Sequence, residues 1–113
     1  MKFPFPPYAH TPGKTPRHPE NLFRPAKSST DAAAVWAHAL ALFRAGFYWE
    51  CHEVLEPLWL SAVRDQRERA FIQGVIQLAN ARLKRRMGRP KASARLEEIA
   101  AGLFQEAGRP SPV

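Results

Sequence analysis

The chain has a single cysteine, few acidic residues and no long apolar run. Cys51 is the only cysteine among 113 residues, so an internal disulfide is excluded, as is typical of proteins in reducing compartments. No stretch approaches the ~20 apolar residues that span a bilayer, and residues 1–7 lack the apolar core of a signal peptide. We therefore expect a cytoplasmic protein without a membrane-spanning segment.

Strand-like alternation of polar and apolar residues is also missing over any useful length, which favours an all-α fold. Apolar residues instead recur at helical spacing in four segments. The first begins within Ser28–Asp31 and ends at Gly46, and the second runs from Phe47 to about Val63. The third covers Gln66 to Met87, and the fourth begins at Pro90 and ends before Gly108. We predict a small antiparallel bundle of about four helices.

Proline is concentrated at the start of the chain, where seven of the eleven prolines precede Ser28. Prolines at this density disfavour helices and central strands, so we expect residues 1–28 to be extended or irregular. Their aromatic residues suggest that parts of this segment lie across the helical body. The expected organisation is a Pro-rich segment (1–28), a helical domain (29–107) and a C-terminal tail (108–113).

His52, Glu56 and Trp59 form the most informative pattern. On a helix, His52 and Glu56 lie about 40° apart and Trp59 about 20° to the other side of His52. Because Tyr48, Trp49 and Leu55 fall in the same sector, we expect this ionisable pair to be buried in an aromatic stripe.

A polar stripe on the third predicted helix has matching spacing. It contains Gln66, Arg69, Gln73, Gln77, Asn80 and Lys84. Gln73 and Gln77 are four residues apart, as are His52 and Glu56, so the two rows can face each other in a bundle. The amides would then orient the imidazole and the carboxylate, and Arg69 would offset a buried Glu charge. The alternative is that this stripe is the solvent-exposed face.

Three interpretations of His52 and Glu56 remain open. They form a structural hydrogen-bond network, they bind a divalent metal ion, or Glu56 orients His52 as a proton carrier. A metal site normally has three or four protein ligands, and Glu53 lies about 100° around the helix from His52. A third ligand would come from His10, His18 or His38, or from a second subunit of a homo-oligomer. We therefore favour the structural interpretation.

A net charge of +7 permits contact with nucleic acid. The basic residues concentrate in one run without acidic residues: Arg82, Lys84, Arg85, Arg86, Arg89, Lys91 and Arg95. Cations also complement a helix C-terminus, and no nucleic-acid-binding motif accompanies the run. We expect at most weak, nonspecific binding.

The stretch Cys51–Trp59 fits a His-x-x-x-Glu-x-x-Trp signature, and Arg69–Ala79 follows it with the sequence Arg-Ala-Phe-Ile-Gln-Gly-Val-Ile-Gln-Leu-Ala. Over roughly 41–103 the chain resembles the family catalogued as domain of unknown function 309. The resemblance implies an all-helical domain in which His52 and Glu56 occupy positions suggested as metal ligands. The family's polar stretch after the third helix, often with His or Asn, is replaced here by Lys84–Arg89. A ligand from that stretch would be missing in this chain.

These observations predict a small helical domain with a buried polar centre and a structural or interaction role. The centre would consist of His52, Glu53, Glu56, Trp59, Arg69, Gln73 and Gln77. A metal-binding protein or metal-dependent enzyme using His52 and Glu56 is the first alternative. A basic nucleic-acid-binding module is the second.

Overall fold

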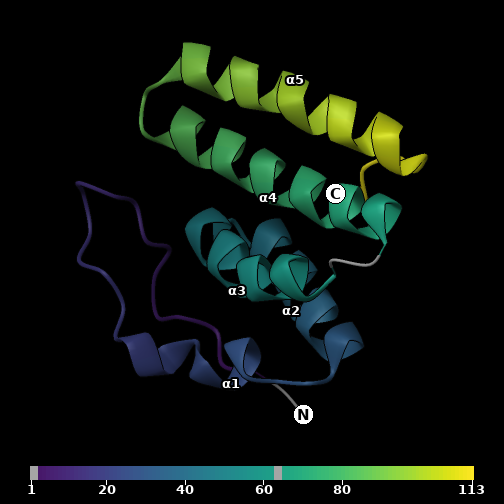
Figure 1. Ribbon diagram of the computed structural model, residues 1–113. Coiled ribbons are helices and arrows are strands. Elements are labelled where there is room, and N and C mark those ends of the chain that lie inside the picture. Colours follow the sequence, from purple (N-terminus) through teal and green to yellow (C-terminus); the bar gives the residue numbers. More distant parts are fainter. Residues whose placement is uncertain (1–2, 63–64) are drawn as a thin grey trace.

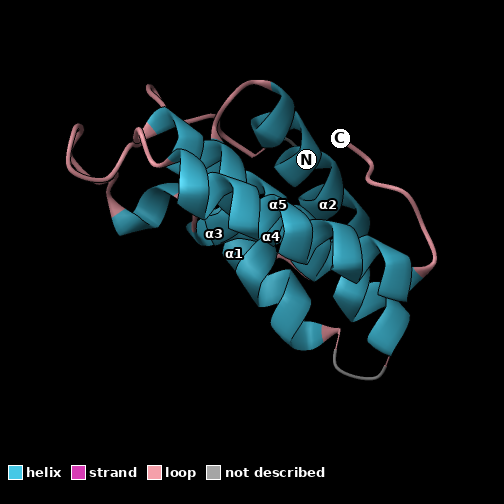
Figure 2. Cartoon of the chain, turned by 90° about the horizontal axis from the view of Figure 1, so that it is seen from above, coloured by secondary structure: helices cyan, strands magenta, loops and turns pink. Residues whose placement is uncertain are grey.

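The computed structural model describes residues 3–62 and 65–113, and all regular structure in those residues is helical (Figure 1, Figure 2). The elements are the 3₁₀ helix η1 (Glu20–Leu22) and the α-helices α1 (Arg24–Lys27), α2 (Ala32–Arg44), α3 (Tyr48–Ser61), α4 (Gln66–Arg86) and α5 (Pro90–Ala107). The all-α prediction is confirmed, with five α-helices in the described part of the chain where about four were expected. The predicted end of the second helix near Val63 lies outside the described residues.

Aspartate side chains begin two of the long helices. Asp31 accepts a hydrogen bond from the backbone N–H of Ala34 at the start of α2, at 3.1 Å. Asp65 accepts from the backbone N–H groups of Arg67 and Glu68 at the start of α4. Each carboxylate satisfies amide groups that have no partner within the helix, and its charge complements the helix dipole.

The Pro-rich segment is more ordered than the sequence indicated, because it contains η1 and α1. The prediction that these residues form no helix was wrong. Pro25 lies in the first turn of α1, where a missing backbone N–H costs no helical hydrogen bond. Phe3, Phe23 and Ala26 from this segment are buried in the core, so it does lie across the helical body as expected.

Helix α4 is the central helix of the fold. Figure 1 shows α4 between α5 on one side and α2 and α3 on the other, and the N-terminal segment with α1 lies beyond α3. Gly74 permits the close approach of α5, because a Cβ at this position would lie 2.7 Å from Cε1 of Phe104. A larger residue at position 74 would therefore clash with α5.

Helix α3 carries the residues singled out above, and it continues through Pro57 without interruption. Its fully buried positions are Glu50, Cys51, Val54 and Leu55. These residues define the face that packs into the core, and the side chains of His52 and Glu56 leave the helix at the border of that face. None of the described helices is long and apolar enough to cross a membrane.

Candidate functional site

His52 and Glu56 form a pair at the edge of the protein rather than inside it. Nε2 of His52 lies 2.9 Å from Oε2 of Glu56, and their side chains are 24% and 52% exposed. The expectation of a buried pair was wrong. The buried face of α3 contains Cys51, Val54 and Leu55. Of the three apolar residues placed in the predicted sector only Leu55 is fully buried, so that sector is not the centre of the core-facing side.

The pair lines a groove between α3 and α4. The groove has a volume of about 200 Å³ and is bordered by His52, Glu56, Trp59, Gln73, Ile76, Gln77 and Asn80. The structure thus brings Gln73 and Gln77 to the same groove as the signature residues. Because the groove is open and its polar side chains are half-buried, a small ligand or ion has access to it.

Glu53 joins the pair as a third group with a ligand atom. One such atom from each of His52, Glu53 and Glu56 lies within 4.8 Å of the others. Oε1 of Glu53 is 3.9 Å from Nδ1 of His52, whereas its Oε2 accepts a hydrogen bond from Nζ of Lys27 at 2.7 Å. The angle of about 100° between positions 52 and 53 suggested that Glu53 points elsewhere, but its flexible side chain brings the carboxylate back.

The histidines expected as further ligands lie elsewhere. His10 and His18 contact Glu50, and His38 packs against the rings of Phe3 and Phe5. Burial lowers the pKa of His38 below its ordinary value of 6.5, because an apolar environment disfavours the charged ring. The three donors of the His52 cluster therefore all come from α3.

Arg69 contacts an aromatic ring instead of the carboxylates of the cluster. Its guanidinium carbon lies 4.3 Å from the centre of the Trp59 ring, a cation–π arrangement. The expected pairing of Arg69 with Glu56 is therefore not found. Arg69 lines a second pocket of about 300 Å³, together with Trp59, Gln66, Ala70, Gln73 and Glu106.

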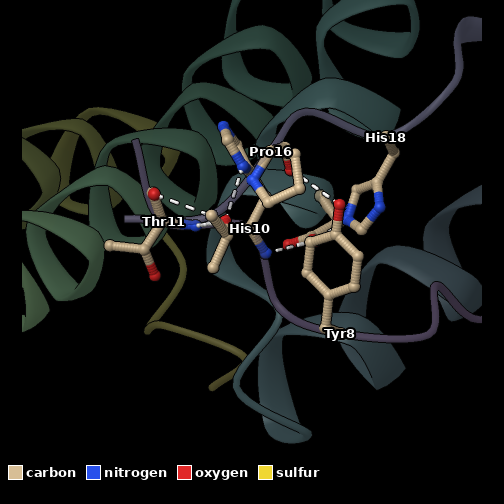
Figure 3. A network of polar contacts seen from close by, with 7 residues as sticks. Tyr8, His10, Thr11, Pro16 and His18 are labelled. Carbon is tan, nitrogen blue, oxygen red and sulfur yellow. Dashed lines mark hydrogen bonds and ion pairs between the residues drawn. The ribbon is translucent and has the colours of Figure 1, made fainter. Parts of the chain in front are cut away.

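The buried polar centre of this protein is a different one, built on Glu50 of α3. Figure 3 shows the N-terminal part of this network, with His10 and His18. The side chain of Glu50 is completely buried, and its Oε2 accepts a hydrogen bond from the backbone N–H of His10 at 2.7 Å. The same oxygen lies 2.7 Å from Nε2 of His18. One carboxylate of α3 thus fastens two points of the N-terminal segment to the helical body.

A second group of contacts orders the loop between those two points. Thr15 Oγ1 accepts a hydrogen bond from the backbone N–H of Thr11 and lies 2.9 Å from Nδ1 of His10. The Tyr8 hydroxyl donates to the carbonyl of Pro16 (Figure 3). This centre was not predicted from the sequence, although Glu50 lies four residues before the apolar Val54 and so shares its core-facing side.

Several cations of the basic run contact the protein itself. Arg82 lies over the ring of Phe43 and Arg86 over the ring of Tyr48, at 5.7 and 4.7 Å from the ring centres. Arg85 forms an ion pair with Glu97 at 2.7 Å. These contacts hold α4 against its neighbours, so part of the run already has partners within the chain.

Cys51 has no exposed surface, and burial beside Glu50 raises the pKa of its thiol to about 12. A thiol in this state is not a nucleophile near neutral pH, and Cys51 is a residue of the hydrophobic core.

Comparison with known sequences finds one family. The sequence profile described as "Domain of unknown function (DUF309)" matches residues 36–96, which include α3, α4 and the start of α5. No curated protein and no solved structure matches the chain.

Proposed function

The chain belongs to the family described as "Domain of unknown function (DUF309)", and we propose that His52, Glu53 and Glu56 bind one divalent transition-metal ion. The observation that carries this proposal is the convergence of one imidazole and two carboxylates from two turns of α3, with ligand atoms within 4.8 Å of one another. An ion placed among them would satisfy all three groups at once.

The chemistry of the donors supports this assignment. One imidazole nitrogen with two carboxylate oxygens suits Zn²⁺, Mn²⁺ or Fe²⁺ better than Ca²⁺ or Mg²⁺, which prefer oxygen ligands alone. Three protein donors leave room for a further ligand from the groove, which is the arrangement of catalytic rather than structural sites. Lys27, hydrogen-bonded to the other oxygen of Glu53, would orient that carboxylate from outside.

A purely structural role for His52 and Glu56 is the main competing function. It is supported by their direct contact at 2.9 Å, which gives each group a partner without any ion. The exposure of Glu56 argues against it, because a half-exposed pair on one helix contributes only about 0.3–0.5 kcal/mol. The buried Glu50 centre is also better suited to hold the fold together.

Calorimetric titration of the EDTA-treated, dialysed protein with Zn²⁺ and Mn²⁺ tests the proposal. We expect one ion per chain in the wild type, and at least about tenfold weaker binding in His52→Ala and Glu56→Gln. At a hundred times its dissociation constant the ion should stabilise the fold by about 2.7 kcal/mol.

Glu98→Gln provides the matched control. Glu98 is an exposed glutamate on α5, and its substitution removes the same charge as Glu56→Gln. Its affinity should equal that of the wild type. Absence of ion binding to the wild type, or equal losses in Glu98→Gln and Glu56→Gln, would overturn the metal assignment and favour the structural one.

A further inference from the structure

The groove beside the His52 cluster continues past Trp59 to Arg69. The two pockets described above share Trp59 and Gln73, so they form adjoining parts of one depression along α3 and α4. His52 and Trp59 are seven residues apart, which corresponds to about 10 Å along α3. A molecule of several non-hydrogen atoms is needed to contact both parts.

Hydrogen-bond donors without partners line this depression. The indole Nε1 of Trp59 is buried and has no hydrogen-bond partner among the described residues. Arg69 forms no ion pair within the described part of the chain. The side-chain amides of Gln73, Gln77 and Asn80 likewise make no hydrogen bond to any described residue. Only the indole N–H among these groups is buried, where a donor normally has an acceptor, and the half-buried side chains add further donors; together they favour a ligand that supplies oxygen atoms.

The guanidinium of Arg69 is also pre-organised to bind an anion. Stacking on Trp59 at 4.3 Å restricts the long side chain, so less conformational freedom is lost when a ligand binds. Its planar set of N–H donors matches the oxygens of a carboxylate or a phosphate. Glu106 borders the same pocket but is exposed and lies beyond ion-pair distance of Arg69, leaving that cation uncompensated.

We propose that this depression binds a small organic molecule carrying an oxyanion, a carboxylate or a phosphate, between the His52–Glu53–Glu56 cluster and Arg69. The inference rests on the proposed metal function, because two carboxylates without a cation would repel an anion. A divalent ion there cancels the charge of the two carboxylates and has an open coordination position, so the ligand then meets the ion at one end, the Arg69 cation at the other and neutral donors between them. Ion and oxyanion should therefore strengthen each other's binding, and the coupling must be reciprocal.

Binding of glutarate and glycerol phosphate, with acetate for comparison, tests the inference in wild-type protein saturated with Mn²⁺ and in protein kept in EDTA. Calorimetry measures the affinity of each probe. Tryptophan fluorescence reports binding near Arg69, because Trp59 lies against that side chain. We expect glutarate or glycerol phosphate to bind at least about tenfold more tightly with Mn²⁺ than with EDTA. Which of the two binds better identifies carboxylate or phosphate as the preferred group, and acetate, too short to reach both parts, should bind more weakly.

Arg69→Met keeps an unbranched side chain over Trp59 and removes the charge. It should weaken binding of the preferred probe by at least about tenfold while leaving the Mn²⁺ affinity measured without probe unchanged. Arg67→Met is the matched control, because Arg67 is an exposed arginine of α4 that lines neither pocket.

The outcomes separate the two proposals. Failure of the wild type to bind Mn²⁺ overturns both. Three outcomes overturn only the oxyanion site. The protein binds Mn²⁺ normally but neither probe, the probes bind equally well in EDTA, or Arg69→Met and Arg67→Met have equal effects.

Discussion

Replacing Glu50 by alanine should destabilise the protein more than replacing any other carboxylate of α3. The side chain is completely buried, and one of its oxygens is the acceptor for the His10 backbone N–H and the partner of His18 Nε2. Alanine leaves both groups buried without that partner. A buried polar group that loses its partner costs about 1–3 kcal/mol, so two cost about 2–6 kcal/mol.

The net loss should lie in the lower half of that range, at about 3 kcal/mol, because removing the carboxylate also removes its own desolvation penalty. Since folded domains of this size have about 5–15 kcal/mol of stability, such a loss is a large fraction of the total. It corresponds to a decrease in Tm of about 12 °C.

Urea unfolding followed by circular dichroism measures the change, and exchange of the His10 amide proton reports whether the N-terminal segment is released. Glu53→Ala, studied in EDTA, is the control. It removes a carboxylate from the same helix that also contacts the N-terminal segment, through Lys27 at the surface, and should cost less than about 1 kcal/mol. Equal stability of Glu50→Ala and Glu53→Ala would refute the assignment of Glu50 as the structural centre.

Three further predictions concern other parts of the molecule. Burial lowers the pKa of His38, so below about pH 6.5 the unfolded chain gains a proton that the folded protein resists. Stability should therefore fall between pH 7 and 5.5, and less so in His38→Phe, as measured by urea midpoints. Gly74→Ala places a methyl group 2.7 Å from Phe104 and should destabilise the fold by about 1–3 kcal/mol. Gly102→Ala should not, because no atom lies within 4 Å of the added methyl group. Thermal unfolding that ranks the two variants in the opposite order would contradict the packing described. The run from Arg82 to Arg95 should bind duplex DNA weakly and without sequence preference, and gel-shift binding that survives added salt would show that the run is a dedicated interface.

The helices were predictable because their signals are local. Asp31 caps one helix, and Gly46, with φ of +86°, follows the end of α2 where a side chain would be strained. Apolar spacing likewise located α4. Each of these features depends on residues that are neighbours in the sequence.

The candidate site was only partly predictable, because burial depends on partners that are distant in sequence. His52, Glu56 and Trp59 were identified together with Gln73 and Gln77, which line the same groove. The centre built on Glu50 was not identified, since His18 precedes it by 32 residues in a segment whose path no periodicity describes. Glu50 and Glu56 lie six residues apart on the same helix, but one carboxylate is buried and the other is half-exposed. The sequence alone does not distinguish these two environments.

The anchoring of Glu50 by the N-terminal segment also bears on where this domain begins. Recognisable similarity to the family is limited to residues 36–96, but His10 and His18 lie before that range. Phe104, which covers Gly74, lies after it. A fragment of residues 36–96 would therefore lack the partners of the Glu50 carboxylate, and it would lack the Phe104 ring that covers Gly74. The unit that folds in this chain therefore extends beyond the part that matches the family, on both sides of it.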